Sequence, residues 1–167
     1  MKSITLFLES KDIPKEILKK LSKIQYDNFT DEEKYIIKTP DQVLKQKQAI
    51  CYDLVELQRE MFNKANYETK TFFSCSKLKM EDDVPTHTYM IFKENNKYFW
   101  IEISWHSYRA IHGPFSSYKD GVRYVEKQLK SSDNWKNVIT LEYPKFNYRN
   151  MNIIDFGNHI LKIGKRI

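Results

Sequence analysis

The segment from Pro85 to Trp105, which reads PTHTYMIFKENNKYFWIEISW, constrains the fold more than any other part of the sequence. It contains two apolar, aromatic-rich runs separated by Asn95 and Asn96, a pattern typical of two antiparallel strands joined by a two-residue turn. Side chains alternate between the two faces of a strand, and an even-length turn keeps the faces of both strands in step. The segment therefore predicts a β-hairpin whose register is set by its turn.

The alternation gives this hairpin one apolar face and one mixed face. The face that we expect to meet the core carries Thr88, Met90, Phe92, Phe99, Ile101 and Ile103. The opposite face carries His87, Tyr89, Ile91, Tyr98, Trp100, Glu102 and Ser104. His87 and Glu102 are diagonal neighbours on it, roughly 7–8 Å apart, and a register shift of two would bring them to about 4.5–5.5 Å. Both registers place an acid and an imidazole on the same face.

A carboxylate beside an imidazole orients the ring and favours its protonated form, and a nucleophile would complete a reactive site. The sequence offers two cysteines for this role. Cys51 adjoins the clearest helical stripe, and the alternative for it is a small buried core residue. Cys75 falls on a predicted strand, and we expect it to be structural. Tyr89 and Trp100 are candidates to line a substrate groove, although aromatic residues on a sheet face commonly just pack.

The remaining segments alternate between helical and strand patterns. Capping residues and apolar stripes predict helices within residues 12–24, 39–61, 117–129 and 151–163. Short β-type runs predict strands at 69–74, 86–92, 98–105, 109–112 and 138–143. The start signal at Thr39 and Pro40 leaves open where the helix that carries Cys51 begins. This order of elements predicts an α+β fold.

Composition narrows the class of protein. A chain of 167 residues with 41% hydrophobic residues suits one globular domain. The net charge of +6 is scattered along the chain, which does not favour a nucleic-acid partner. No run is apolar for long enough to span a membrane, and the first ten residues lack a signal-peptide cleavage pattern, so we expect a cytoplasmic protein. The cysteines lack CxxC spacing, so no metal or other cofactor is expected.

A cysteine on a helix, a histidine at the head of a strand and an acid fifteen residues later on the next strand form an ordered set. This set resembles the transglutaminase-like branch of the papain-like cysteine superfamily, in which cysteine, histidine and aspartate follow in that order. Residues 105–113, with Arg109 and His112, more narrowly resemble small bacterial proteins of this type. The resemblance covers about residues 39–129 of a single domain spanning 1–167. The segments that carry it are TPDQVLKQKQAICYDLVEL (39–57), THTY (86–89) and KYFWIE (97–102).

The resemblance implies a papain-like core in which a cysteine-bearing helix packs on an antiparallel sheet. Cys51 would be the nucleophile, His87 the general base, and Glu102, in place of the usual aspartate, the group that orients His87. The implied reaction is acyl transfer on an amide bond of a peptide or protein through a thioester. Hydrolysis is preferred over cross-linking because no acceptor site can be read from the sequence; the rival interpretation is a non-catalytic binding or scaffold protein.

Two details of the family pattern differ in this sequence or are missing from it. The family commonly has a glycine just before its cysteine, where this chain has Ala49 and Ile50. An uninterrupted helix from Thr39 would place Cys51 about three turns inside it. The donors for an oxyanion are also not evident, and the candidates are the backbone N–H of Cys51 and the side chains of Gln46 and Gln48.

Overall fold

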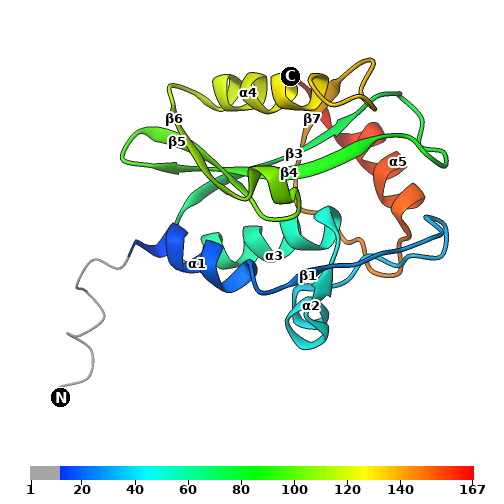
Figure 1. The fold of residues 1–167 in the computed structure, drawn as a ribbon, viewed down its shortest axis with the longest axis horizontal. Coiled ribbons are helices and arrows are strands. Elements are labelled where there is room, and N and C mark those ends of the chain that lie inside the picture. Colours follow the sequence, from blue (N-terminus) through cyan, green and yellow to red (C-terminus); the bar gives the residue numbers. More distant parts are fainter. Residues whose placement is uncertain (1–11) are drawn as a thin grey trace.

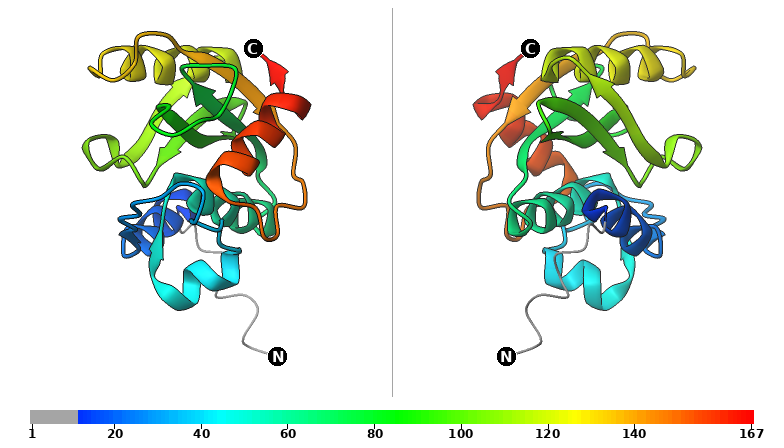
Figure 2. Two further views of the ribbon diagram at one scale, coloured as in Figure 1. Left: turned by 90° about the vertical axis from the view of Figure 1, so that its right-hand side faces the viewer. Right: turned by 90° about the vertical axis from the view of Figure 1, so that its left-hand side faces the viewer.

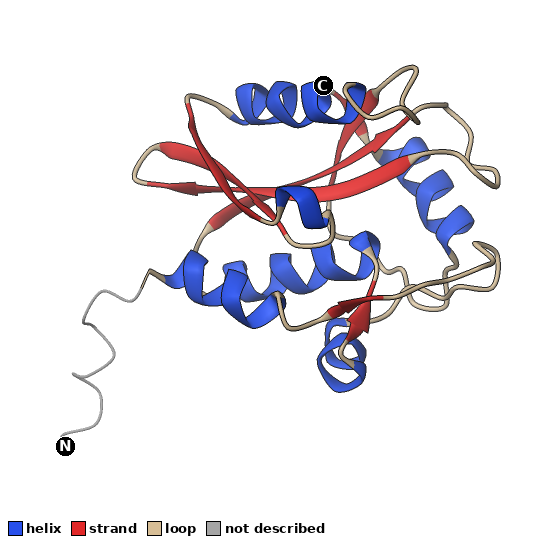
Figure 3. Ribbon diagram, in the orientation of Figure 1, coloured by secondary structure: helices blue, strands red, loops and turns tan. Residues whose placement is uncertain are grey.

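A six-stranded antiparallel sheet lies at the centre of the structure, a computed structural model that describes residues 12–167. The N-terminal stretch for which no signal peptide was expected lies outside the described residues. The strand order is β6–β5–β4–β3–β7–β8 (Figure 3). The strands are β3 (Glu68–Cys75), β4 (Thr86–Glu94), β5 (Lys97–Glu102), β6 (Ala110–Phe115), β7 (Ile139–Tyr143) and β8 (Lys165–Arg166).

Helices cover both faces of this sheet (Figures 1 and 2). On one face lie α1, α3 and α5, and on the other lies α4. A small parallel sheet of β1 (Gln25–Tyr26) and β2 (Gln48–Ala49) adjoins the start of α3. The helices are α1 (Ile13–Leu21), α2 (Pro40–Gln46), α3 (Cys51–Lys64), α4 (Tyr118–Lys130) and α5 (Ile153–Ile163), with a short 3-10 helix η2 (His106–Tyr108). The predicted α+β class is confirmed.

The capping residues that predicted the helix starts form the expected hydrogen bonds. The side chains of Asp12, Thr39 and Ser117 each accept a bond from a backbone N–H three residues later. Such caps satisfy N–H groups that have no partner within the helix itself. Asn152 caps α5 in the same way, although the sequence pattern there was weak.

The register predicted for the hairpin is confirmed. Asn95 and Asn96 form its turn with φ angles of 50° and 59°, the positive values that a tight hairpin turn requires. Ile91 pairs with Trp100, and Met90 pairs with Ile101. The apolar face packs against α1 and α3, as expected for the core face.

The opposite face of the hairpin differs from its predicted character, because it is buried as well. Tyr89 and Trp100 are only 1% and 0% exposed. They pack against the apolar stripe of α4, formed by Val122, Val125 and Leu129. The sequence shows this stripe but not which surface it covers, so the face appeared to be a mixed surface. The end of this face, at His87 and Ser104, borders a cavity.

Candidate active site

The helical segment is interrupted between α2 and α3, and this interruption decides where Cys51 lies. Helix α2 ends at Gln46, and Lys47 then takes a left-handed φ of 58°. The two residues of β2 follow, and α3 begins at Cys51. The thiol therefore lies on the first residue of a helix, where unpaired N–H groups and the helix dipole stabilise negative charge. The helix that carries Cys51 therefore begins at Cys51 itself, although the glycine that commonly precedes the cysteine in this pattern is absent.

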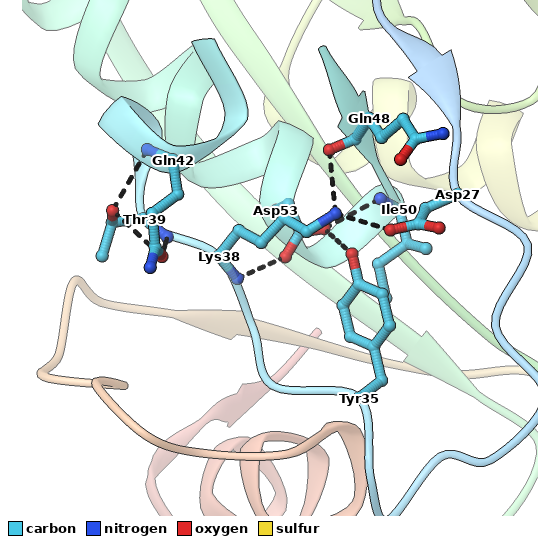
Figure 4. Close-up of polar contacts among 8 residues, drawn as sticks. All are labelled: Asp27, Tyr35, Lys38, Thr39, Gln42, Gln48, Ile50 and Asp53. Atoms are coloured by element: carbon cyan, nitrogen blue, oxygen red, sulfur yellow. Dashed lines mark hydrogen bonds and ion pairs between the residues drawn. The ribbon is translucent and has the colours of Figure 1, made fainter. Parts of the chain in front are cut away.

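Asp53 organises this helix start (Figure 4). Its carboxylate accepts hydrogen bonds from the backbone N–H of Ile50 at 2.9 Å and of Lys38 at 2.7 Å. The hydroxyl of Tyr35 donates a third bond, at 2.5 Å. Burial raises the pKa of Asp53 to about 6, against the lowering effect of these bonds. Sequence reasoning missed this role; the available signal was an acid at the third helical position, where it can reach back to the N-cap.

His87 and Glu102 form a buried pair in which Nε2 of His87 lies 2.7 Å from Oε2 of Glu102. The other oxygen of Glu102 is fixed by three donors in the turn after β5. These are the backbone N–H groups of Ile103 and Trp105, at 2.8 and 3.0 Å, and the hydroxyl of Ser104, at 3.0 Å. The carboxylate is thus held in place, and it orients the imidazole.

The two halves of the site are joined by the residues next to Cys51 and His87. The hydroxyl of Tyr52, on α3, lies 2.7 Å from the hydroxyl of Thr86, on β4. This contact brings the start of the helix to the start of the strand. Because Nε2 of His87 faces Glu102, Nδ1 is the ring nitrogen left for the thiol of Cys51, which lines the same cavity as the imidazole. The structure therefore brings the three residues together.

The charge of the pair follows from these contacts. Burial alone would lower the pKa of His87, but the charge of Glu102 and the neighbouring thiol of Cys51 raise it to about 10. Burial acts to raise the pKa of Glu102, yet the facing His87 and the donors in the turn lower it. At neutral pH the pair is an imidazolium facing a carboxylate.

A cavity of about 230 Å³ borders the thiol and the imidazole. Two tryptophans and a tyrosine, none of them predicted, give it aromatic walls, and among residues 12–167 no carboxylate or lysine lines it. The lining residues are Tyr26, Cys51, Thr86, His87, Ser104, Trp105, Leu129, Ser132 and Trp135. Tyr89 and Trp100, the expected groove residues, do not line this cavity because α4 covers them.

A family model described as a transglutaminase-like domain matches residues 9–138. The chain belongs to this family. The match includes Cys51, His87 and Glu102, as well as the whole of residues 39–129, where the resemblance was found. Among curated proteins, none matches the sequence.

The two side chains predicted as oxyanion donors in this transglutaminase-like domain lie away from the cavity. Gln46 ends α2 and Gln48 lies in β2; both are exposed, and neither lines the cavity. The backbone oxygen of Gln48 instead accepts a hydrogen bond from the Lys38 ammonium at 3.0 Å (Figure 4). Gln46 lies before the turn at Lys47, and Gln48 lies directly after it, on the exposed side of β2.

The second cysteine of the transglutaminase-like domain has different surroundings. Cys75 is fully buried at the end of β3, and its thiol donates to the backbone oxygen of Ile139 at 3.8 Å. Burial raises its pKa to about 11. Both cysteines are free thiols. The surroundings of Cys75 thus suit a structural thiol.

Residues 12–167 contain no group of three or more His, Cys, Asp or Glu side chains placed to hold a metal ion. None of the helices in this range combines the length and apolar character needed to cross a membrane.

Proposed function

We propose that this transglutaminase-like protein transfers acyl groups from amide bonds through a thioester on Cys51, with water as the main acceptor. The observation that carries the proposal is the position of Cys51 on the first residue of α3, beside an imidazole held by Glu102. A thiol at a helix N-terminus next to an imidazolium is the environment in which cysteine acts as a nucleophile.

The steps assign a role to each of the three side chains. The Cys51 thiolate attacks the carbonyl carbon of the amide, and the carbonyl electron pair moves to oxygen. When that pair returns, the C–N bond breaks and the amine leaves with the proton from Nδ1 of His87. Water then attacks the thioester, and His87 takes its proton. Release of the carboxylic acid restores the thiol, while Glu102 keeps the ring oriented throughout.

Hydrolysis is favoured over cross-linking by the composition of the cavity. A lysine or polyamine acceptor carries a positive charge and would need a carboxylate to bind it, yet in the described part of the chain no carboxylate lines the cavity. Water needs no such group. The aromatic walls and small hydroxyls suit an uncharged acyl group.

Selective alkylation tests the proposal. Iodoacetamide should modify Cys51 on the order of 10 times faster than it modifies glutathione, because a helix N-terminus and a neighbouring imidazole make a thiol more nucleophilic. His87→Ala should remove this advantage. Glutathione is the reference because Cys75 is buried and would react slowly in any case. If Cys51 reacts no faster than glutathione and its alkylation rate is unchanged in His87→Ala, the protein is a scaffold that keeps the fold without turnover.

A further inference from the structure

Tyr26 lines the cavity although it lies far from Cys51 in the sequence, and a strand pairing places it there. It ends β1, which pairs in parallel with β2, so that Tyr26 lies opposite Ala49. Its side chain lines the cavity together with Cys51 and His87. A tyrosine twenty-five residues before the cysteine thus reaches the reacting centre.

The backbone on both sides of Tyr26 is fixed. The N–H of Gln25 donates to the oxygen of Lys47 at 2.9 Å, and the N–H of Asp27 donates to the oxygen of Ala49 at 3.0 Å. The carboxylate of Asp27 also accepts a hydrogen bond from the Lys38 ammonium at 2.5 Å (Figure 4). These contacts order the strand without using the hydroxyl of Tyr26. The backbone of Tyr26 is therefore held beside the cavity that its side chain lines, as suits a group that must be in place before the transition state forms.

The hydroxyl of Tyr26 is available as a donor. Within residues 12–167 it makes no side-chain hydrogen bond, whereas two other hydroxyls of the cavity are engaged: that of Thr86 with Tyr52 and that of Ser104 with Glu102. The side chain of Tyr26 is 40% exposed, and its partial burial, followed by the charges of Cys51 and nearby carboxylates, raises the pKa of the phenol. The phenol accordingly keeps its proton at every pH at which the site would work.

We propose that Tyr26 is a catalytic residue whose hydroxyl, together with the backbone N–H of Cys51, donates a hydrogen bond to the oxyanion of the tetrahedral intermediate. The inference rests on the proposed function. As the thiolate attacks, the carbonyl electron pair moves to oxygen and the two donors stabilise the negative charge. No proton leaves Tyr26. The pair returns when the amine departs with the proton from His87, so Tyr26 contributes only at the stage where the oxygen is charged.

Two reactions of Cys51 separate this role from a structural one. Acylation by p-nitrophenyl acetate passes through an oxyanion, whereas alkylation by iodoacetamide does not. We expect Tyr26→Phe to slow the acylation burst by roughly 10²–10³-fold, the effect of losing one oxyanion donor. The alkylation rate should stay within about twofold of wild type. Tyr67→Phe is the matched control, because its hydroxyl bonds Glu94 away from the cavity and its loss should change neither rate.

Each other outcome overturns the assignment. Equal slowing of alkylation and acylation in Tyr26→Phe would mean that Tyr26 acts on the thiol or on the fold. A larger acylation loss in Ser132→Ala than in Tyr26→Phe would move the role to the other hydroxyl of the cavity. If wild type shows no acylation burst beyond that of Cys51→Ala, the proposed function fails and the role of Tyr26 fails with it. If wild type is acylated and Tyr26→Phe matches it, only the role of Tyr26 fails.

Discussion

The carboxylate of Asp53 accepts a hydrogen bond from the backbone N–H of Ile50 at 2.9 Å, and so fixes the residue directly before Cys51. The same carboxylate receives the N–H of Lys38. One buried side chain thereby joins the helix start to a loop that lies before α2. No glycine stands before the cysteine. The left-handed conformation of Lys47 ends α2, and the hydrogen bonds of Asp53 stabilise the start of α3.

Replacing Asp53 by asparagine should weaken this junction. Asparagine has one acceptor oxygen and an NH₂ group that would face backbone donors, so at least one buried N–H loses its partner. We expect the free energy of unfolding in urea at pH 7.5 to fall by about 1–3 kcal/mol. Asp155→Asn is the control, because Asp155 occupies the same third position in α5 but is exposed. An equal loss in both variants would contradict the role given to Asp53.

The pair of His87 and Glu102 should make stability depend on alkaline pH. The pKa of His87 in the folded protein is about 10, above its ordinary value of 6.5. A raised pKa means that the stabilisation is complete below about pH 6.5 and is lost as the pH rises through about 10. Urea unfolding at pH 7 and pH 10.5 should therefore show a decline to which this pair contributes.

Glu102→Gln isolates that contribution, because it removes the charge that holds the proton on His87 while nearly keeping the shape. The other groups that titrate near pH 10 are unchanged in the variant. We expect its decline between pH 7 and pH 10.5 to be smaller than that of wild type. Parallel pH profiles would show that the imidazole is not held protonated by the carboxylate. His87→Gln should give the same reduced decline if Glu102→Gln folds poorly.

Gly157 marks a close approach between α5 and the loop after β3. A Cβ at this position would lie 2.5 Å from Cγ and 2.8 Å from Sδ of Met80, which is itself buried. Alanine favours a helix by about 1 kcal/mol over glycine, so an isolated helix would gain from the change. We expect Gly157→Ala to destabilise the protein instead, by about 1–2 kcal/mol, because overpacking outweighs the propensity.

A double-mutant cycle tests the cause of that loss. Met80→Ala creates a cavity and should destabilise the protein alone, but it removes the atoms that the new methyl group meets. Gly157→Ala should therefore cost less in the Met80→Ala background than in wild type. Thermal unfolding of the four proteins measures the coupling. Additive losses would place the clash elsewhere.

Sequence reasoning succeeded where the relevant contacts are local. Side-chain alternation and the Asn95–Asn96 turn correctly predicted the hairpin register, because both depend on residues adjacent in the chain. That register placed His87 and Glu102 on one face. Capping residues correctly marked three helix starts for the same reason.

Contacts between segments distant in the sequence could not be predicted from local patterns. The stripe of α4 was recognised, yet nothing in it says that it covers Tyr89 and Trp100. The pairing of β1 with β2, which brings Tyr26 to Cys51, involves two-residue strands too short to leave a pattern. The roles expected for Gln46 and Gln48 failed to match their positions because the chain turns at Lys47.

By itself, the sequence determined the hairpin, its register, the shared face of His87 and Glu102, and the order of cysteine, histidine and acid. These follow from steric rules between near neighbours, which act whatever the rest of the chain does. Only the tertiary structure decided that α3 begins at Cys51 and that Tyr26 lines the cavity. Those features depend on buried polar contacts, such as that of Asp53 with Lys38, which exist only once distant segments have packed together.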